Sequence, residues 1–157
     1  MNSSSKNVST PDAIDFLIND HNYLKKLFKE FESMDKDAYD LKKTAALTIC
    51  DFLDVHTDIE EQIFYPKIGP AINDADMINE ALVEHGASKD LMAKIREMSP
   101  EEELFDANVH VLKEQIEHHV DEEEEEMFPE VRKTSLDLLK LGEQMQARKK
   151  ELESKQK

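Results

Sequence analysis

Hydrophobic residues recur every three or four positions through most of this chain, which is the spacing of an amphipathic α-helix. The pattern predicts a first helix over 11–33, with its apolar stripe at Ile14, Leu17, Leu24, Phe28 and Phe31. Thr10, Pro11 and Asp12 form a suitable start. They supply a capping side chain, a proline for the first helical position and an acid at the positive end of the helix dipole.

Three more amphipathic segments follow. The second helix is predicted over 38–65 and ends at Pro66, because proline lacks the backbone N–H that the next turn needs. The third begins near Asp74. The fourth follows a capping box at 99–102 and ends shortly before Pro129. Long helices with short connections are typical of an all-α, antiparallel up-down-up-down four-helix bundle.

The chain divides into three parts. Residues 1–10 are polar and are predicted to be a disordered N-terminal arm. Residues 11–141 form the bundle, including a short C-terminal helix at 131–141 that carries five apolar side chains. Residues 142–157, which begin with a glycine, are mostly charged and are predicted to be a C-terminal helix or tail.

Composition narrows the class of protein. A chain of 157 residues corresponds to one domain, and its few glycines and prolines favour helix. The net charge of −16 argues against partners that need clustered Lys and Arg, namely nucleic acid and anionic membranes. A single cysteine, Cys50, excludes an intramolecular disulfide. Neither a signal peptide nor an apolar stretch of ~20 residues is visible, so we expect a cytoplasmic protein.

An internal repeat links the second and fourth helices. Residues 56–66 align without gaps on 119–129, and the identical positions are a histidine, an aspartate, two adjacent glutamates and the closing proline. In both copies the first of the two glutamates lies four residues after the histidine. Histidine and glutamate at this spacing lie on one helix face, where both can reach the same ion.

Four histidines have a glutamate four residues later. Their position relative to the apolar stripe of each helix indicates which of them face the core. His56 and His119 lie on the apolar faces of their helices, whereas His110 and His118 are predicted to face solvent. Glu84 and His118 are candidates for outer hydrogen-bond partners. On the first and third helices, one histidine each shares the apolar stripe, His21 and His85.

All four inward histidines lie at the same depth. Each is ten or eleven residues from its helix end, which at ~1.5 Å per residue is about 15 Å from the same end of the bundle. A single inward histidine is more often a hydrogen-bonded core residue, but helix formation does not require four to align. Glu60 and Glu123 at the same level would cost several kcal/mol in an apolar core unless they were paired or bound a metal ion. We therefore predict a two-metal site made of His21, His56, Glu60, His85, His119 and Glu123.

The order His, His-x3-Glu, His, His-x3-Glu, with prolines closing the second and fourth helices, resembles the hemerythrin-like (HHE cation-binding) family over residues 11–130. The resemblance implies a non-haem centre of two Fe ions bridged by Glu60 and Glu123; Mn or Zn also suit such ligands. The chain departs from the respiratory oxygen carriers. Those proteins have a His-x3-His motif on the third helix, whereas here the fourth residue after His85 is Lys89. They also have an aspartate five residues after the last histidine, where this chain has Glu123 at four.

Two functions remain open at this stage. The first is a di-iron protein that binds, senses or reacts with a small ligand, O2, NO or peroxide. The second is a non-enzymatic metal-handling or iron-responsive module whose bundle is stabilised by metal. A third, a structural bundle without metal, is disfavoured by the shared depth of the histidines. The sequence leaves open whether the protein is an enzyme, and any protein partner is not identifiable.

Overall fold

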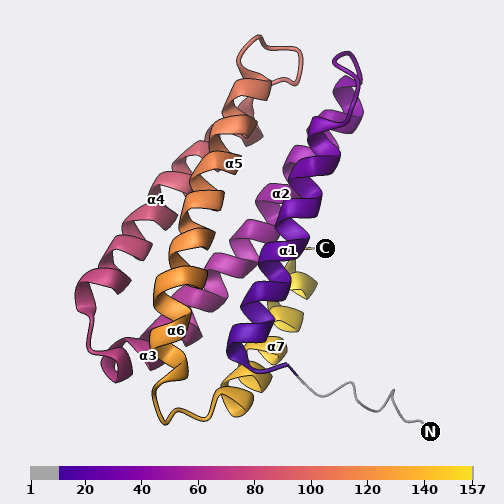
Figure 1. Ribbon diagram of the computed structural model, residues 1–157. Helices are drawn as coiled ribbons and strands as arrows, with labels where there is room; N and C mark the ends of the chain where they lie inside the picture. Colours follow the sequence, from indigo (N-terminus) through magenta and orange to yellow (C-terminus); the bar gives the residue numbers. More distant parts are fainter. Residues whose placement is uncertain (1–10, 157) are drawn as a thin grey trace, which may run out of the picture.

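Figure 1 shows the computed structural model, which describes residues 11–156 and contains only helices in that range. Four long helices run side by side, namely α1 (Ala13–Glu32), α2 (Tyr39–Ile59), α4 (Ala75–Glu97) and α5 (Phe105–Glu122). The predicted all-α four-helix bundle is confirmed. The predicted N-terminal arm, and Thr10 with it, lies outside the described residues.

Side-chain caps fix the starts of α1 and α4. Asp12 caps α1 by accepting the Asp15 N–H at 2.8 Å, and Asp74 caps α4 by accepting the Met77 N–H at 3.1 Å. Only the glutamate half of the predicted capping box at 99–102 forms, and it closes a turn and not the helix. Glu102 accepts the Ser99 N–H at 2.6 Å. Helix α5 begins only at Phe105, whose side chain is fully buried.

The predicted ends of the second and fourth helices are wrong, because both helices continue past their prolines. In each, a π-helical turn follows, η2 (Glu60–Phe64) or η3 (Glu123–Met127), and then a further short helix, α3 (Tyr65–Ile72) or α6 (Phe128–Arg132). Each proline is near the first position of its short helix, where a missing N–H costs little. The π turn therefore lets the chain pass a proline without ending the helix.

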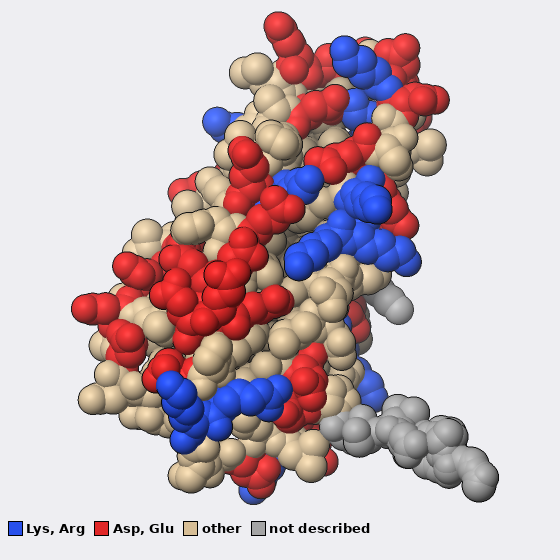
Figure 2. All heavy atoms as spheres, in the orientation of Figure 1, with Lys and Arg blue, Asp and Glu red and all other residues tan. Residues whose placement is uncertain are grey.

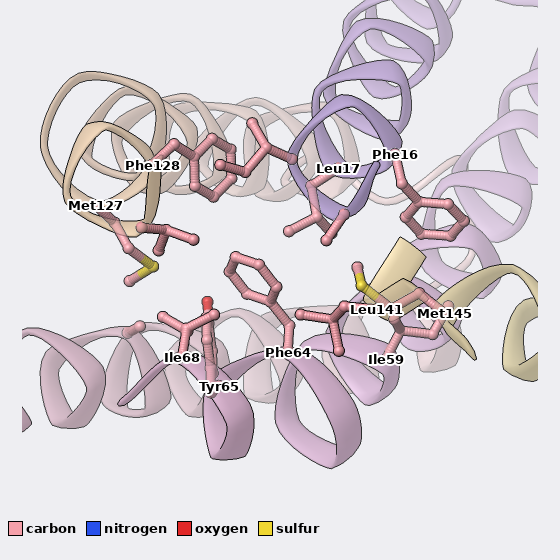
Figure 3. Close-up of a cluster of buried hydrophobic side chains, with 14 of the residues drawn as sticks. Phe16, Leu17, Ile59, Phe64, Tyr65, Ile68, Met127, Phe128, Leu141 and Met145 are labelled. Atoms are coloured by element: carbon pink, nitrogen blue, oxygen red, sulfur yellow. The ribbon is translucent and has the colours of Figure 1, made fainter. Parts of the chain in front are cut away.

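The apolar core consists of two clusters, one on each side of the level of the inward histidines. One is built mainly on α1, η2, α3, α6 and α7. Figure 3 shows its centre, where Phe64 points towards Phe128 and Leu17. The Phe64 and Phe128 rings meet edge to face with centroids 5.9 Å apart. The other cluster fills the far half of the bundle between α1, α2, α4 and α5.

A C-terminal helix is present, but the predicted bounds of 131–141 are wrong, because residues 133–137 are not helical and the helix extends through the segment predicted as a helix or tail. α7 (Leu138–Lys155) packs beside α1 and α2 and runs through Gly142 without interruption. Gly142 marks a close approach and not a boundary, because a Cβ there would lie 2.6 Å from the backbone oxygen of Pro11. Across residues 11–156, no helix combines the length and the apolarity that a membrane span requires.

Candidate metal centre

The structure brings all six predicted site residues together in the middle of the bundle. None of these six residues is more than 5 % exposed. They form two groups that could each hold a metal ion. The first contains His21, His56, Glu60 and Glu123, and the second contains Glu60, His85 and His119.

The two glutamates lie between the two groups. Glu60 Oε1 is 3.0 Å from His85 Nε2 and 3.5 Å from His56 Nε2. Glu123 has one oxygen 3.2 Å from His21 Nε2 and the other 3.3 Å from His119 Nε2. Each carboxylate thus contacts one histidine of each group, which is the arrangement that a bridging carboxylate needs.

A second set of carboxylates orients the histidines from outside. Every Nδ1 lies 2.6–2.9 Å from a carboxylate oxygen; the pairs are His21 with Glu124, His56 with Asp20, His85 with Glu61 and His119 with Glu84. An imidazole that donates its Nδ1–H to a carboxylate presents the lone pair of Nε2 on the opposite side. All four Nε2 atoms then face the centre.

Three of these outer carboxylates were missed by the sequence analysis, and only Glu84 was recognised. The internal repeat could have shown two of them, because Glu61 and Glu124 occupy the same position in both copies. Asp20 corresponds to Glu84, since each lies directly before an inward histidine. Asp20 also accepts a hydrogen bond from Lys149 of α7 at 2.9 Å, so the C-terminal helix supports the orientation of His56.

Tyr65 is a further residue that sequence reasoning missed. Its buried hydroxyl donates a 2.5 Å hydrogen bond to Glu123 and lies 3.3 and 3.4 Å from Nε2 of His119 and His85. In an α-helix, five residues turn through about 500°, which would direct Tyr65 well away from Glu60. The π turn η2, whose hydrogen bond joins residues five apart, brings Tyr65 back to the same face.

The buried acids and imidazoles shift one another's protonation. Burial lowers the pKa of His119, but the charge of Glu123 and the neighbouring carboxylates of Glu60 and Glu84 outweigh the burial and raise the pKa well above its usual value. Burial raises the pKa of Glu123, but the charge and hydrogen bond of His119 hold it well below its usual value. Burial and the charges of Glu123 and Glu60 raise the pKa of Tyr65 well above its usual value, so the phenol stays protonated.

Unpaired buried atoms test whether a cation fits this centre. Among residues 11–156, five buried side-chain atoms lack a hydrogen-bond partner, and four of them belong to the six residues: His21 Nε2, both oxygens of Glu60, and Glu123 Oε1. Some of these atoms lie close to an imidazole nitrogen, but not at hydrogen-bonding angles. Leaving a buried polar atom unpaired costs about 1–3 kcal/mol. Bound metal would satisfy all four of these atoms, so this set of donor atoms fits a metal centre.

The other candidate histidines and the lysine lie outside the centre. The side chains of His110 and His118 are 59 % and 69 % exposed, as the face assignment predicts. Lys89, which stands where the oxygen carriers have a histidine, is 38 % exposed and lies 3.7 Å from Glu61. It contacts an outer carboxylate and not the centre.

Comparison with known proteins agrees with this geometry. The family model described as "Hemerythrin HHE cation binding domain" matches residues 12–131. The crystal structure of a hemerythrin HHE cation binding domain-containing protein from Mycobacterium kansasii is similar, with a TM-score of 0.79 and 26 % sequence identity. The match covers 92 % of this chain and 89 % of that one. No curated protein matches the sequence. With four inward histidines, two shared glutamates and a family match over most of its length, the chain belongs to the hemerythrin HHE cation-binding domain family.

Proposed function

We propose that this protein holds two non-haem iron ions at the buried centre and uses them to bind, sense or react with O2, NO or peroxide. The observation that carries the proposal is the set of four unpaired polar atoms among six buried histidine and glutamate side chains. A core that was only structural would gain stability by replacing these groups with apolar ones.

The donor set suits iron. His21 and His56 would hold one ion, His85 and His119 the other, and Glu60 and Glu123 would lie between them. Imidazole and carboxylate ligands suit Fe and also accept Mn or Zn. Four protein ligands on each ion leave positions open, and iron with open positions supplies the electrons for chemistry with O2, NO or peroxide.

A small cavity beside the centre offers space for a small molecule. A cavity of about 10 Å³ touches His56, His85 and His119, and its other lining residues are five apolar side chains, Leu24 and Met92 among them, and four polar ones. Its size admits a molecule of only two or three atoms. On the neighbouring side, Tyr65 keeps a proton on its hydroxyl oxygen, hydrogen-bonded to Glu123. The chain thus excludes bulk water and holds one proton beside the metal positions.

A metal-handling or iron-responsive module is the second candidate. The observation in its favour is a cavity lined by acidic side chains that reaches His119 and Glu123 from the surface. Metal binding would then stabilise the bundle and present it to a protein partner. A reducing, cytoplasmic location agrees with the free, buried thiol of Cys50.

Metal content and reactivity test the proposal together. Protein purified without added metal is analysed for elements, and its absorption spectrum is recorded before and after addition of NO or peroxide. We expect about two irons per chain and a spectrum that both reagents change. Two ions with no response to either reagent would favour the metal-handling function. Absence of bound metal, with no change in stability on adding Fe, Mn or Zn, would refute both.

A further inference from the structure

An acidic cavity connects the surface to the candidate metal centre. It has a volume of about 220 Å³, lies mainly between α4 and α5, and reaches His119 and Glu123. No lysine or arginine lines it; its acidic residues besides Glu123 are Asp74, Asp76, Glu80, Glu84, Glu122 and Glu126. Figure 2 shows acidic side chains gathered over the half of α4 and α5 next to α3 and α6.

The inner end of this cavity is a buried carboxylate with one unpaired oxygen. Glu123 is 1 % exposed, lines the cavity, and has an oxygen without a hydrogen-bond partner. Acidic surface alone is usually a solvated face. Here the acids lead to a carboxylate whose free oxygen needs a cation, so the two observations point to the same kind of ligand.

The outer end holds a second group of possible ligands. His118 Nε2 lies 3.5 Å from Glu122 and 3.8 Å from Glu84, and the ligand atoms of all three lie within 4.8 Å of one another. They line a shallow surface hollow that shares Asp76, Glu80, Glu84 and Glu122 with the acidic cavity. Glu84 uses its other oxygen to bind His119 Nδ1 at 2.6 Å. One carboxylate therefore contacts both the outer group and the centre.

The second cavity that touches the centre is unsuitable for a cation. The cavity of about 10 Å³ beside His56 has the cationic Lys89 in its lining, and it is too small for an ion that keeps several waters. The acidic cavity offers carboxylate oxygens along its length. A cleft lined by charges of one sign raises the local concentration of counter-ions and their association rate by about 10–1,000-fold.

We propose that divalent cations reach the centre through this acidic cavity, and that His118, Glu122 and Glu84 form an outer cation site at its mouth. The proposal rests on the proposed metal function and adds to it the route by which the ions are loaded.

Loading kinetics of the full-length, metal-free protein test the route. Co²⁺ is the probe, because its absorption bands report binding to histidine and carboxylate without any redox step. The route variant D76N/E80Q/E126Q removes three exposed acids that line the cavity. The control E30Q/D40N/E143Q removes the same charge from exposed positions elsewhere, and its aspartate, like Asp76, lies in the first turn of a helix.

At low ionic strength we expect the route variant to load Co²⁺ at least about tenfold more slowly than the control, with the same final count of two ions in the centre. The difference should shrink at high salt, since screening weakens attraction between separated charges. Equal loading rates in the two variants would overturn the route. If the unsubstituted protein takes up no Co²⁺, the proposed metal function fails instead, so the two failures are distinguishable.

Counting ions tests the outer site separately. Titration of the unsubstituted protein should detect one weakly held ion beyond those of the centre, and His118→Ala should lose only that ion. This histidine is largely exposed, so the variant is expected to fold normally. An unchanged ion count in His118→Ala, or no ion beyond the centre in the unsubstituted protein, would overturn the outer site.

Discussion

Replacing Tyr65 with phenylalanine removes one buried hydroxyl and leaves the ring in place. That hydroxyl donates a 2.5 Å hydrogen bond to Glu123, a buried carboxylate whose pKa the charge and hydrogen bond of His119 hold well below its usual value despite burial. A hydrogen bond to a charged group contributes about 1.5–3 kcal/mol. The substitution should therefore lower the free energy of unfolding of the metal-free protein by about that amount.

The corresponding change in melting temperature is large enough to measure. For a chain of this size, 1 kcal/mol shifts the melting temperature by roughly 2–4 °C, so we expect a fall of about 3–12 °C. The assay is thermal unfolding followed by circular dichroism, with a chelator present so that differences in metal binding do not contribute.

Tyr23→Phe is the matched control. Tyr23 is 43 % exposed and its ring packs against Phe52, with centroids 4.9 Å apart, but its hydroxyl makes no hydrogen bond within residues 11–156. The control should melt within about a degree of the unsubstituted protein. If Tyr65→Phe were as stable as Tyr23→Phe, the hydroxyl would not be a donor to Glu123, and the role assigned to Tyr65 would be refuted.

Three further substitutions or reactions test other parts of the structure. His56→Ala should lose bound metal and with it the stabilisation by metal, which is about 2.7 kcal/mol when the free metal concentration is a hundred times Kd. His110→Ala should keep both the metal and the stabilisation. The reverse result, measured as metal-dependent melting, would show that the helix faces are assigned wrongly. Gly142→Ala should lower the free energy of unfolding, measured in urea, by about 1–3 kcal/mol because the new Cβ meets the backbone before α1. Gly86→Ala, whose Cβ would meet nothing within 4 Å, should raise it by about 0.5–1 kcal/mol. Similar effects of the two substitutions would contradict the close approach of α7 to the start of α1. Burial raises the pKa of Cys50 to about 11, so its thiol should react with a disulfide reagent at pH 8 only after unfolding, and fast reaction of the folded protein would contradict this.

Simple helix geometry was sufficient to predict which six side chains come together. Inward direction follows from the apolar stripe and depth from counting residues, and the six predicted residues do lie together. What the sequence did not predict depends on departures from a straight α-helix. The π turns η2 and η3 change which residues face inward and carry both helices past their prolines, and no periodicity of 3.6 residues reveals them.

Gly142 illustrates a second limit. Glycine in a charged segment indicates a helix end when only local preferences are considered. In the folded protein it lies where α7 crosses the start of α1, and the need for a missing side chain arises from a segment about 130 residues away. The lysine that reaches Asp20 from α7 could not be assigned for the same reason, because its partner is set by packing and not by sequence spacing.

The internal repeat also shows where the two halves of the centre differ. Glu61 and Glu124 make equivalent bonds to His85 and His21, and Asp20 and Glu84 do the same for His56 and His119, so the outer carboxylates are symmetric. The aromatic residues that follow are not. Phe128 stacks on His21 with centroids 6.0 Å apart, whereas its counterpart Tyr65 brings a hydroxyl to the His85 and His119 side. The acidic cavity, Glu84 and the small cavity all reach His119 as well. The repeat therefore builds two similar candidate metal positions, and the position at His85 and His119 is the one with both a hydroxyl and a cavity beside it. Under the proposed function, this is the side on which we expect an incoming ion or small molecule to meet the centre.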